Sequence, residues 1–353
     1  MNGTAWWNAQ GGKAVQPHQP AGHGQAAQRI RMTAGTIMGA VILIGAMIAP
    51  LCAQTYPGKP LRLIIPFPGG GGGADYVGRV IGQKLAERLG QPVVIENRPG
   101  AAGNIGIELV AKAQPDGYTL LLTTPSLTIS PSLYKKLNYD PVRDLAPISL
   151  VAEIPNLFLV RPSLPVRSLK EFVDYARANP GKLNFGGSGI GSSTHLATVL
   201  FMSLAKVNLV NVTYKGSAQA LIGMLGGEID VIVIGPTAAM PQIQAGKVRA
   251  LAVLRNERLP SLPNVPTIKE AGIDNSEVTT WYGILAPAGT PRDIINRLNA
   301  EWIRIAAMPD TLEKMQNAGV ETMSGTPEQF AELIKAEIAR WAKVIKEANV
   351  SIE

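Results

Sequence analysis

Two glycine-rich stretches, each running from an apolar segment into an amphipathic one, carry most of the polar chemistry of this 353-residue sequence. The first, "PFPGGGGGAD", spans residues 66–75, and the second, "GGSGIGSSTH", spans residues 186–195. A helix N-terminus presents unpaired backbone N–H groups and the positive end of the helix dipole, and glycine lets the backbone approach a ligand closely. Each stretch therefore predicts an anion site.

The second stretch adds short hydroxyl side chains that can bind a carboxylate directly or through water, namely Ser188, Ser192, Ser193 and Thr194. Neither stretch contains Lys or Arg. A site built from amides and hydroxyls fits a small carboxylate released reversibly better than a tightly held phosphate. We expect the two helix N-termini to converge on one such ligand.

The glycine run fits three other motifs to different degrees. A Walker A loop is excluded, because Ala74 and Asp75 follow the last glycine where Lys and Ser or Thr are required. A Rossmann fingerprint stays open, since Gly69, Gly71 and Ala74 satisfy G-x-G-x-x-A and Glu96 follows about 20 residues later. In the third interpretation the glycines form only a tight turn, with Asp75 as the helix N-cap. We expect Asp75 to be a cap and not an acid catalyst.

The sequence offers little for catalysis. His195 is the only histidine after residue 53, which excludes a His-rich metal site. Ser192 and His195 would share one turn, and "GGSGIG" does not fit the G-x-S-x-G motif of hydrolases. We therefore predict no catalytic residue, no metal and no cofactor. His195 is expected to pack at the helix start and to hydrogen-bond the opposite domain or the ligand.

The elements that position these stretches alternate between short apolar strands and amphipathic helices. One series begins at Leu61 and a second follows residue 168, which is typical of an α/β fold with mostly parallel sheets. Apolar residues of the first helix share one face, namely Val77, Val80, Ile81, Leu85 and Leu89. The glycine loops are thus free to face each other across a cleft.

Composition sets the scale of the fold. An apolar content of 46% in 353 residues supports two domains. The net charge is +7, but residues 54–353 hold 30 basic and 26 acidic residues, a net charge of +4. That excess, without any run of Lys and Arg, gives no support for nucleic-acid binding.

The N-terminus predicts export. Arg29 and Arg31 precede an uncharged segment, Met32–Ala53, as in a secretory signal peptide. An uncleaved membrane anchor is the alternative, because the segment approaches the length of about 20 residues that spans a bilayer. Cleavage after Ala53 would remove Cys52, the single cysteine, and leave a mature chain without disulfides.

Read together, "ENRPGAAGNIG", "PDGYTLLL", "YKGSAQAL" and "WYGILAPAGTP" make the chain resemble the Bug-type receptors, the extracytoplasmic solute-binding components of tripartite tricarboxylate transporters. The resemblance implies a two-domain, type II-like periplasmic binding protein with its ligand cleft between the domains. It implies a monomeric receptor that captures a small organic carboxylate and delivers it to membrane permease subunits. An exported ligand sensor remains an alternative, as does a dinucleotide-binding or serine-dependent enzyme.

The resemblance also implies the domain boundaries and the site. Residues 1–53 would be leader and signal peptide, 54–154 and 279–353 a discontinuous first domain, and 155–278 the second. The ligand-binding residues carried over are Phe67, Pro68, Gly70, Gly71, Gly72 and Asp75 in the first pincer, Ser188, Gly191, Ser192, Thr194 and His195 in the second, and Thr124, Ser126, Tyr214 and Gly216 along the cleft.

One departure from the family pattern bears on specificity. Many relatives end the "DV" strand with an Asp in the cleft, whereas "IDVIVIGPT" places Ile234 there. An Asp can receive a ligand's amino group and Ile234 cannot. We hypothesise that the ligand is not an amino acid and carries an apolar or aromatic distal part.

Overall fold

The computed structural model describes residues 56–70, 72–274 and 277–347. The expected leader, signal peptide and cleavage site, and Gly71, lie outside the described residues. The part from Tyr56 onward is one compact unit that contains two β-sheets. Within the described ranges, no helix has both the length and the apolar character needed to cross a bilayer.

The first sheet has six strands in the order β11-β4-β10-β3-β1-β2. Strand β1 pairs in parallel with β2 and β3, whereas β10 runs antiparallel to β3 and β4. The strands are β1 (Leu61–Ile65), β2 (Val93–Asn97), β3 (Thr119–Thr123), β4 (Leu145–Pro155), β10 (Thr279–Pro287) and β11 (Glu321–Thr322).

The second sheet has five strands in the order β7-β6-β8-β5-β9. Strand β6 pairs in parallel with β7 and β8, and β5 runs antiparallel to β8 and β9. The strands are β5 (Leu157–Val160), β6 (Asn184–Gly187), β7 (Val210–Thr213), β8 (Val231–Ile234) and β9 (Arg249–Val253).

Both sheets are mixed, which corrects the expectation of mostly parallel sheets. The parallel order holds for β3-β1-β2 and β7-β6-β8, where helical crossovers join the strands. The remaining pairs are antiparallel because the chain leaves the first sheet along β4 and returns to it along β10. The glycine-rich loops follow β1 and β6, both within the parallel halves.

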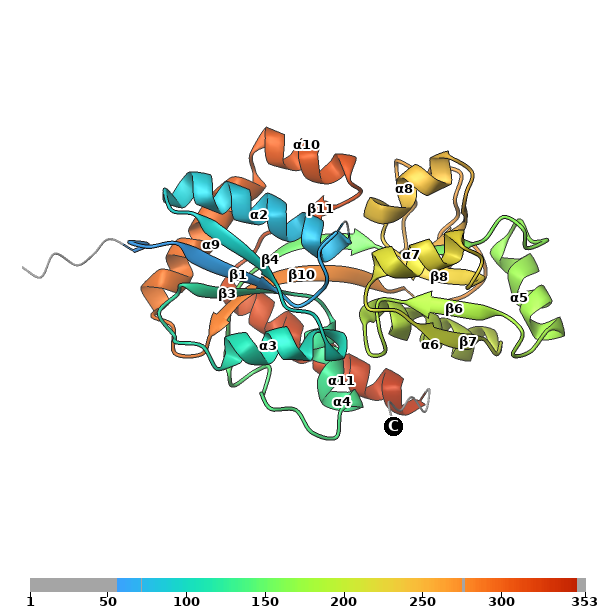
Figure 1. Ribbon diagram of the computed structural model, residues 1–353, viewed down its shortest axis with the longest axis horizontal. Coiled ribbons are helices and arrows are strands. Elements are labelled where there is room, and N and C mark those ends of the chain that lie inside the picture. The colour runs from blue at the N-terminus through green and yellow to red at the C-terminus, as the bar shows by residue number, and fades with distance from the viewer. Residues whose placement is uncertain (1–55, 71, 275–276, 348–353) are drawn as a thin grey trace, which may run out of the picture. The chain divides into compact units, whose positions relative to one another are not determined.

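Helices cover both faces of the first sheet (Figure 1). Leu61, Leu63 and Ile65 of β1 face one core, and the intervening Ile64 faces the other, as strand alternation requires. The first face carries α2 (Gly73–Leu89), α9 (Arg292–Ala306) and α10 (Pro309–Asn317). The second carries the short helix η1 (Ala101–Gly103), α3 (Asn104–Ala111), α4 (Ser126–Leu133) and α11 (Pro327–Glu347).

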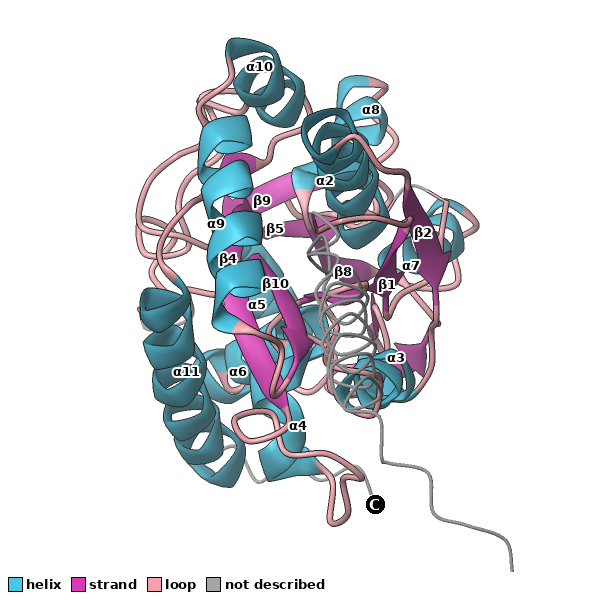
Figure 2. Cartoon of the chain, turned by 90° about the vertical axis from the view of Figure 1, so that its left-hand side faces the viewer, coloured by secondary structure: helices cyan, strands magenta, loops and turns pink. Residues whose placement is uncertain are grey.

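The second sheet is covered in the same way, and the strands lie between helices in Figure 2 as well. Phe158 and Val160 pack with one pair of helices, and Leu157 and Leu159 pack with the other pair. The first pair is α5 (Leu169–Ala178) and α6 (Ser193–Ala205), and the second is α7 (Ser217–Leu225) and α8 (Pro236–Gln244).

The C-terminal helix α11 contributes to both cores. Phe330 and Ile334 pack in the core of the first sheet with Leu285. Trp341 and Ile345, two to three turns later, pack in the core of the second sheet. The chain passes between the sheets at Asn156 and again between β9 and β10, near the expected crossings. The division into two domains at these points stays a prediction.

Candidate ligand-binding site

One pocket is lined from both sheets, and four helices begin at it. The N-cap residues of α2, α6, α7 and α8 all line this pocket, namely Gly72, Ser192, Gly216 and Gly235. The first-turn N–H groups of a helix have no intrahelical partner, and the dipole makes this end positive. We call this cavity the main pocket. The sequence predicted two of these helix N-termini, and the structure brings four together.

The start of α2 requires a glycine at residue 73. The first intrahelical bond runs from the N–H of Tyr76 to the carbonyl oxygen of Gly72, at 3.0 Å. A Cβ at Gly73 would lie 2.6 Å from the hydroxyl oxygen of Tyr282 and 2.8 Å from Cδ1 of Ile154. Only glycine therefore fits at this point without a shift of its neighbours.

Asp75 is not the N-cap of α2, contrary to the prediction, because Gly72 holds that position through its backbone. The Asp75 carboxylate instead accepts the N–H of Gly70 at 3.1 Å and pairs with Arg79 at 3.0 Å. It also accepts a hydrogen bond from Asn97. Burial would raise the pKa of Asp75, but these bonds outweigh it and hold the pKa below its usual range. Asp75 thus holds the loop in place as a carboxylate.

The start of α6 is capped by a side chain. The hydroxyl oxygen of Ser192 accepts the N–H of His195 at 3.2 Å. The Thr194 hydroxyl lies 3.2 Å from that of Ser192 and 3.0 Å from that of Ser188. Three hydroxyls are thereby gathered at one end of the pocket.

The starts of α7 and α2 approach each other across the pocket. A Cβ at Gly72 would lie 3.4 Å from the hydroxyl oxygen of Ser217, and a Cβ at Gly216 would lie 3.4 Å from Cδ of Pro68. At the start of α8, a Cβ at Gly235 would lie 2.4 Å from Cγ2 of Ile154. Glycine at the helix starts lets the backbones come this close.

The lining of the main pocket contains no Lys, Arg or His, and Asp75 is its one carboxylate among the described residues. Positive potential at the pocket therefore comes from helix ends rather than from cations. Such a site can hold an anion through several N–H and O–H donors.

Comparison with known proteins agrees with this geometry. The family model of the tripartite tricarboxylate transporter family receptor, TctC, matches residues 77–350. The chain belongs to this receptor family. A protein from the tcbD-tcbE intergenic region of Pseudomonas sp. strain P51 is 41% identical over 318 residues, which cover 88% of this chain and 94% of that protein.

Solved structures show the same fold. R. palustris Rpa4515 with adipate is 37% identical with a TM-score of 0.81 and covers 84% of this chain and 100% of its own. Periplasmic binding protein BugD is 36% identical with a TM-score of 0.80, at 84% and 99% coverage. MatC from Rhodopseudomonas palustris with bound malate is 34% identical with a TM-score of 0.78, at 82% and 100% coverage. This chain therefore has the two-sheet fold of periplasmic binding proteins, and as a member of this receptor family it is a solute-binding protein rather than an enzyme.

The structure brings ten of the predicted site residues to the main pocket of the receptor. They are Phe67, Pro68, Gly72, Asp75, Thr124, Ser188, Ser192, Thr194, Gly216 and Ile234. Five others lie outside its lining, namely Gly70, Ser126, Gly191, His195 and Tyr214, and Gly71 is not described. The Ser126 hydroxyl lies 3.1 Å from that of Thr124 and supports this lining residue from behind.

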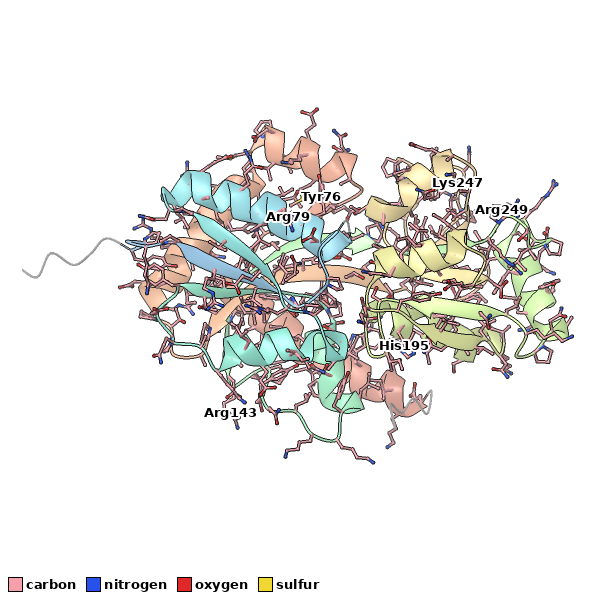
Figure 3. The ribbon with its side chains drawn as sticks, in the orientation of Figure 1. Tyr76, Arg79, Arg143, His195, Lys247 and Arg249 are labelled. Atoms are coloured by element: carbon pink, nitrogen blue, oxygen red, sulfur yellow. The ribbon has the colours of Figure 1, made fainter. Side chains whose placement is uncertain are left out.

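His195 lies at the start of α6, where Figure 3 labels it. The hydrogen bonds and the ring contact found for it among the described residues stay within its own β6–α6 segment. Its Nδ1 accepts the N–H of Gly191 at 3.4 Å, and its ring stacks on Phe185. Burial lowers the pKa of His195 to about 4. The ring is therefore neutral at pH 7 and shapes the loop that carries Ser188 and Ser192.

Glu96, which the Rossmann interpretation needs as a ribose ligand, is already engaged. Its carboxylate accepts hydrogen bonds from Arg62 at 2.6 Å and Arg98 at 2.9 Å. The Arg62 hydrogen bond is the main cause of a pKa lowered to about 2. Family membership and this ion pair together set the dinucleotide interpretation aside.

Sequence reasoning missed several lining residues, among them Asn156, Ser217, Gln219, Thr237, Thr280 and Tyr282. Alternation along β10 was a usable signal for two of them. Thr280 and Tyr282 point to the main pocket, and Trp281 between them packs edge-on against Phe330 on the other face. The others follow from how the two sheets meet, which no local pattern reports.

Proposed function

We propose that this receptor is a periplasmic protein that holds a small organic carboxylate in the main pocket and delivers it to the membrane permease subunits of a tripartite transporter. The observation that carries the proposal is the convergence of four helix N-termini on a pocket whose described lining residues include no cation. Amide and hydroxyl donors can hold a carboxylate while letting it dissociate.

The solved relatives support the ligand class. Rpa4515 was solved with adipate and MatC with malate, and both acids carry carboxylates. In this chain the carboxylate would meet the N–H groups at the starts of α2 and α6, together with the hydroxyls of Ser188, Ser192 and Thr194. The predicted ligand-binding residues that line the main pocket are part of the proposal.

Capture by closure of the two sheets on the ligand belongs to the same proposal. The pocket takes its walls from both sheets, so a bound acid would join them.

A periplasmic location is also part of the proposal. The uncharged segment Met32–Ala53 behind Arg29 and Arg31 is the pattern of an export signal, and BugD is a periplasmic binding protein. We propose that the receptor acts as a monomer.

The proposal is tested by thermal unfolding of residues 54–353 with a panel of mono-, di- and tricarboxylates, aromatic acids, amino acids and NAD. A ligand at 100 times its Kd adds about 2.7 kcal/mol to the free energy of unfolding. We expect a rise of several degrees in the midpoint with one class of carboxylate. A rise of the midpoint with NAD alone would contradict the proposal. So would the absence of a rise with every acid in the panel.

Specificity at Ile234 is proposed in addition. Ile234 lines the main pocket and is 1% exposed, so it offers no partner for an ammonium group. We expect calorimetric titrations to show weak binding of aspartate and glutamate compared with dicarboxylates that lack the amino group. Tight binding of either amino acid would rule out this specificity.

A further inference from the structure

The main pocket is too small for a bulky ligand tail. Its free volume is about 70 Å³. An engineered apolar cavity that binds benzene measures about 150 Å³. A carboxylate with a short chain fits in the main pocket, but an aromatic ring or a long alkyl chain attached to it needs further room.

A second cavity of about 500 Å³ adjoins the main pocket, and we call it the side chamber. Phe67 and Ser188 line both cavities and therefore form a shared wall. The side chamber takes its other walls from both sheets' loops. Much of this lining is apolar, including Pro66, Pro99, Tyr134 and Ile190.

The wall of the side chamber is held in an unusual backbone conformation. Four consecutive residues, Gly100, Ala101, Ala102 and Gly103, have φ values of 136°, 47°, 54° and 102°. Two alanines with positive φ store strain that the surroundings must stabilise, and such strain clusters at ligand sites. Gly103 lies directly behind the shared wall, since a Cβ there would be 3.5 Å from Cζ of Phe67.

The charge at the side chamber is positive. Lys215 is the single charged residue of its described lining, it is exposed, and no ion pair of its side chain is found among the described residues. Its lining, as far as the structure describes the chain, includes no carboxylate. A neutral or electron-rich ligand tail is therefore accepted there, and a cationic tail is disfavoured.

We propose that the side chamber receives the distal part of the ligand, an aromatic ring or an extended alkyl chain, from an organic acid whose carboxylate is held in the main pocket. This inference rests on the proposed carboxylate function and deepens it. The ligand passes between Phe67 and Ser188, and the chamber walls select the tail through apolar contact. The substrate class is thus an acid with a bulky, uncharged or anionic tail.

The test compares acids that share a head group and differ by a ring: acetate with phenylacetate, and succinate with phenylsuccinate. Affinities are measured by calorimetry on the purified full chain. Burying a ring is expected to make at least one phenyl-substituted acid bind about tenfold tighter than its parent or more. Equal affinity within both pairs would overturn the proposed role of the side chamber while leaving the carboxylate function intact. Failure of every acid to bind would overturn both.

Variants that fill the side chamber distinguish its contribution to binding from that of the main pocket. Ile190→Trp is expected to weaken the phenyl-substituted acid about tenfold and to leave its parent within twofold. Thr213→Trp, at an exposed position of the same lining, serves if the first variant does not fold. Ile222→Trp is the matched control, because Ile222 is 68% exposed and lines neither cavity. Equal losses for both acids in the filled variants would overturn the proposal.

Discussion

The hydroxyl oxygens of Ser193 and Thr280 lie 3.1 Å apart, although 87 residues separate them in the sequence. Ser193 is the first residue of α6, and Thr280 lies on β10 of the first sheet. Thr280 also accepts a hydrogen bond from the side-chain amide of Asn156, which stands where the chain first crosses between the sheets. A polar network thus joins one pincer to the point where the two sheets connect.

Removing this network is expected to lower the free energy of unfolding. Ser193→Ala removes one buried hydrogen bond, which contributes about 0.5–1.5 kcal/mol. Denaturant unfolding of Ser193→Ala, Thr280→Val and the double variant measures the coupling between the two hydroxyls. Independent, additive effects would show that the two side chains do not stabilise each other.

Gly73→Ala is expected to weaken carboxylate binding more than tenfold and to lower stability by about 1–3 kcal/mol, as overpacking does. The cause is the 2.6 Å approach of the new Cβ to the Tyr282 hydroxyl. Adding Tyr282→Phe removes that oxygen and is expected to restore part of the loss. Gly226→Ala, where the nearest atom lies at 3.4 Å, is the control. Calorimetry and thermal unfolding that show no change in Gly73→Ala would contradict this account.

Stability is expected to depend on pH through His195. Its pKa falls from 6.5 to about 4 on folding because the ring is buried, so between these pH values the unfolded chain binds the proton more strongly. The free energy of unfolding is thus unaffected above pH 6.5 and decreases by roughly 3 kcal/mol as the pH falls to 4. In residues 54–353, which contain no other histidine, His195→Gln is expected to flatten this part of the pH profile. A profile identical to that of the wild type would exclude His195 as the cause.

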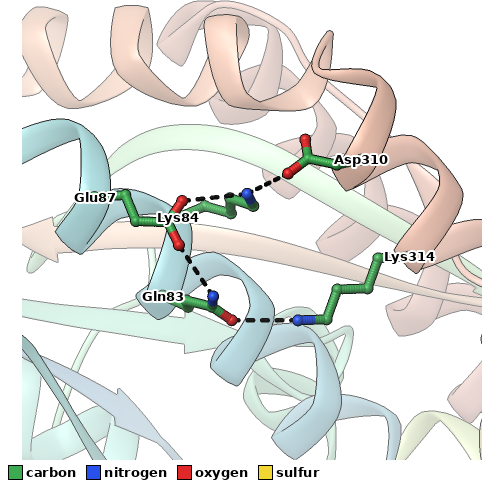
Figure 4. A network of polar contacts seen from close by, with 5 residues as sticks. All are labelled: Gln83, Lys84, Glu87, Asp310 and Lys314. Carbon is green, nitrogen blue, oxygen red and sulfur yellow. Dashed lines mark hydrogen bonds and ion pairs between the residues drawn. The ribbon is translucent and has the colours of Figure 1, made fainter.

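Helix α2 is held against α10 by a network of charged and polar side chains (Figure 4). Lys84 contacts Asp310 at 2.5 Å and Glu87 at 3.2 Å, and Lys314 donates to Gln83 at 3.2 Å. Lys84→Met is expected to lower the melting temperature slightly, with the difference shrinking at high salt because screening weakens such pairs. Lys343→Met, at a more exposed pair, is the control. A salt-independent difference would point to packing instead.

Ile234→Asp is expected to shift the specificity of the pocket toward ligands that carry an amino group. A buried carboxylate at this position would repel a ligand carboxylate and could receive an ammonium group. We expect succinate to lose more than tenfold in affinity and aspartate to lose less. Ile234→Asn, which is polar but uncharged, separates the effect of charge from that of polarity. Parallel losses for both ligands in calorimetry would place Ile234 away from the ligand's amino position.

Local patterns predicted the individual elements well. The apolar face predicted for the first helix is buried in one core of the first sheet, with Val77, Val80, Ile81, Leu85 and Leu89 on α2. Both glycine-rich loops precede helices at one pocket, as predicted. Alternating apolar residues and glycine before a helix are signals carried by neighbouring residues, so they could be recognised without knowing the fold.

What depends on distant pairing could not be predicted in the same way. The starts of α7 and α8 reach the main pocket because β6 and β8 are neighbours in the second sheet and β5 joins on the other side of β8. Asp75 lies three residues past the backbone cap of α2, and its bonding to Gly70 and Asn97 depends on how the loop folds back. Neither arrangement can be predicted from a short segment of the sequence alone.

Helix α11 has a consequence for how the molecule unfolds. Phe330 and Trp341 on this one helix pack in different cores, and Ile129 of α4 likewise packs in the second core although α4 covers the first sheet. Neither sheet can lose its packing without exposing side chains that belong to the other. Heating is therefore expected to unfold both sheets in a single cooperative transition, because each sheet stabilises the packing of the other.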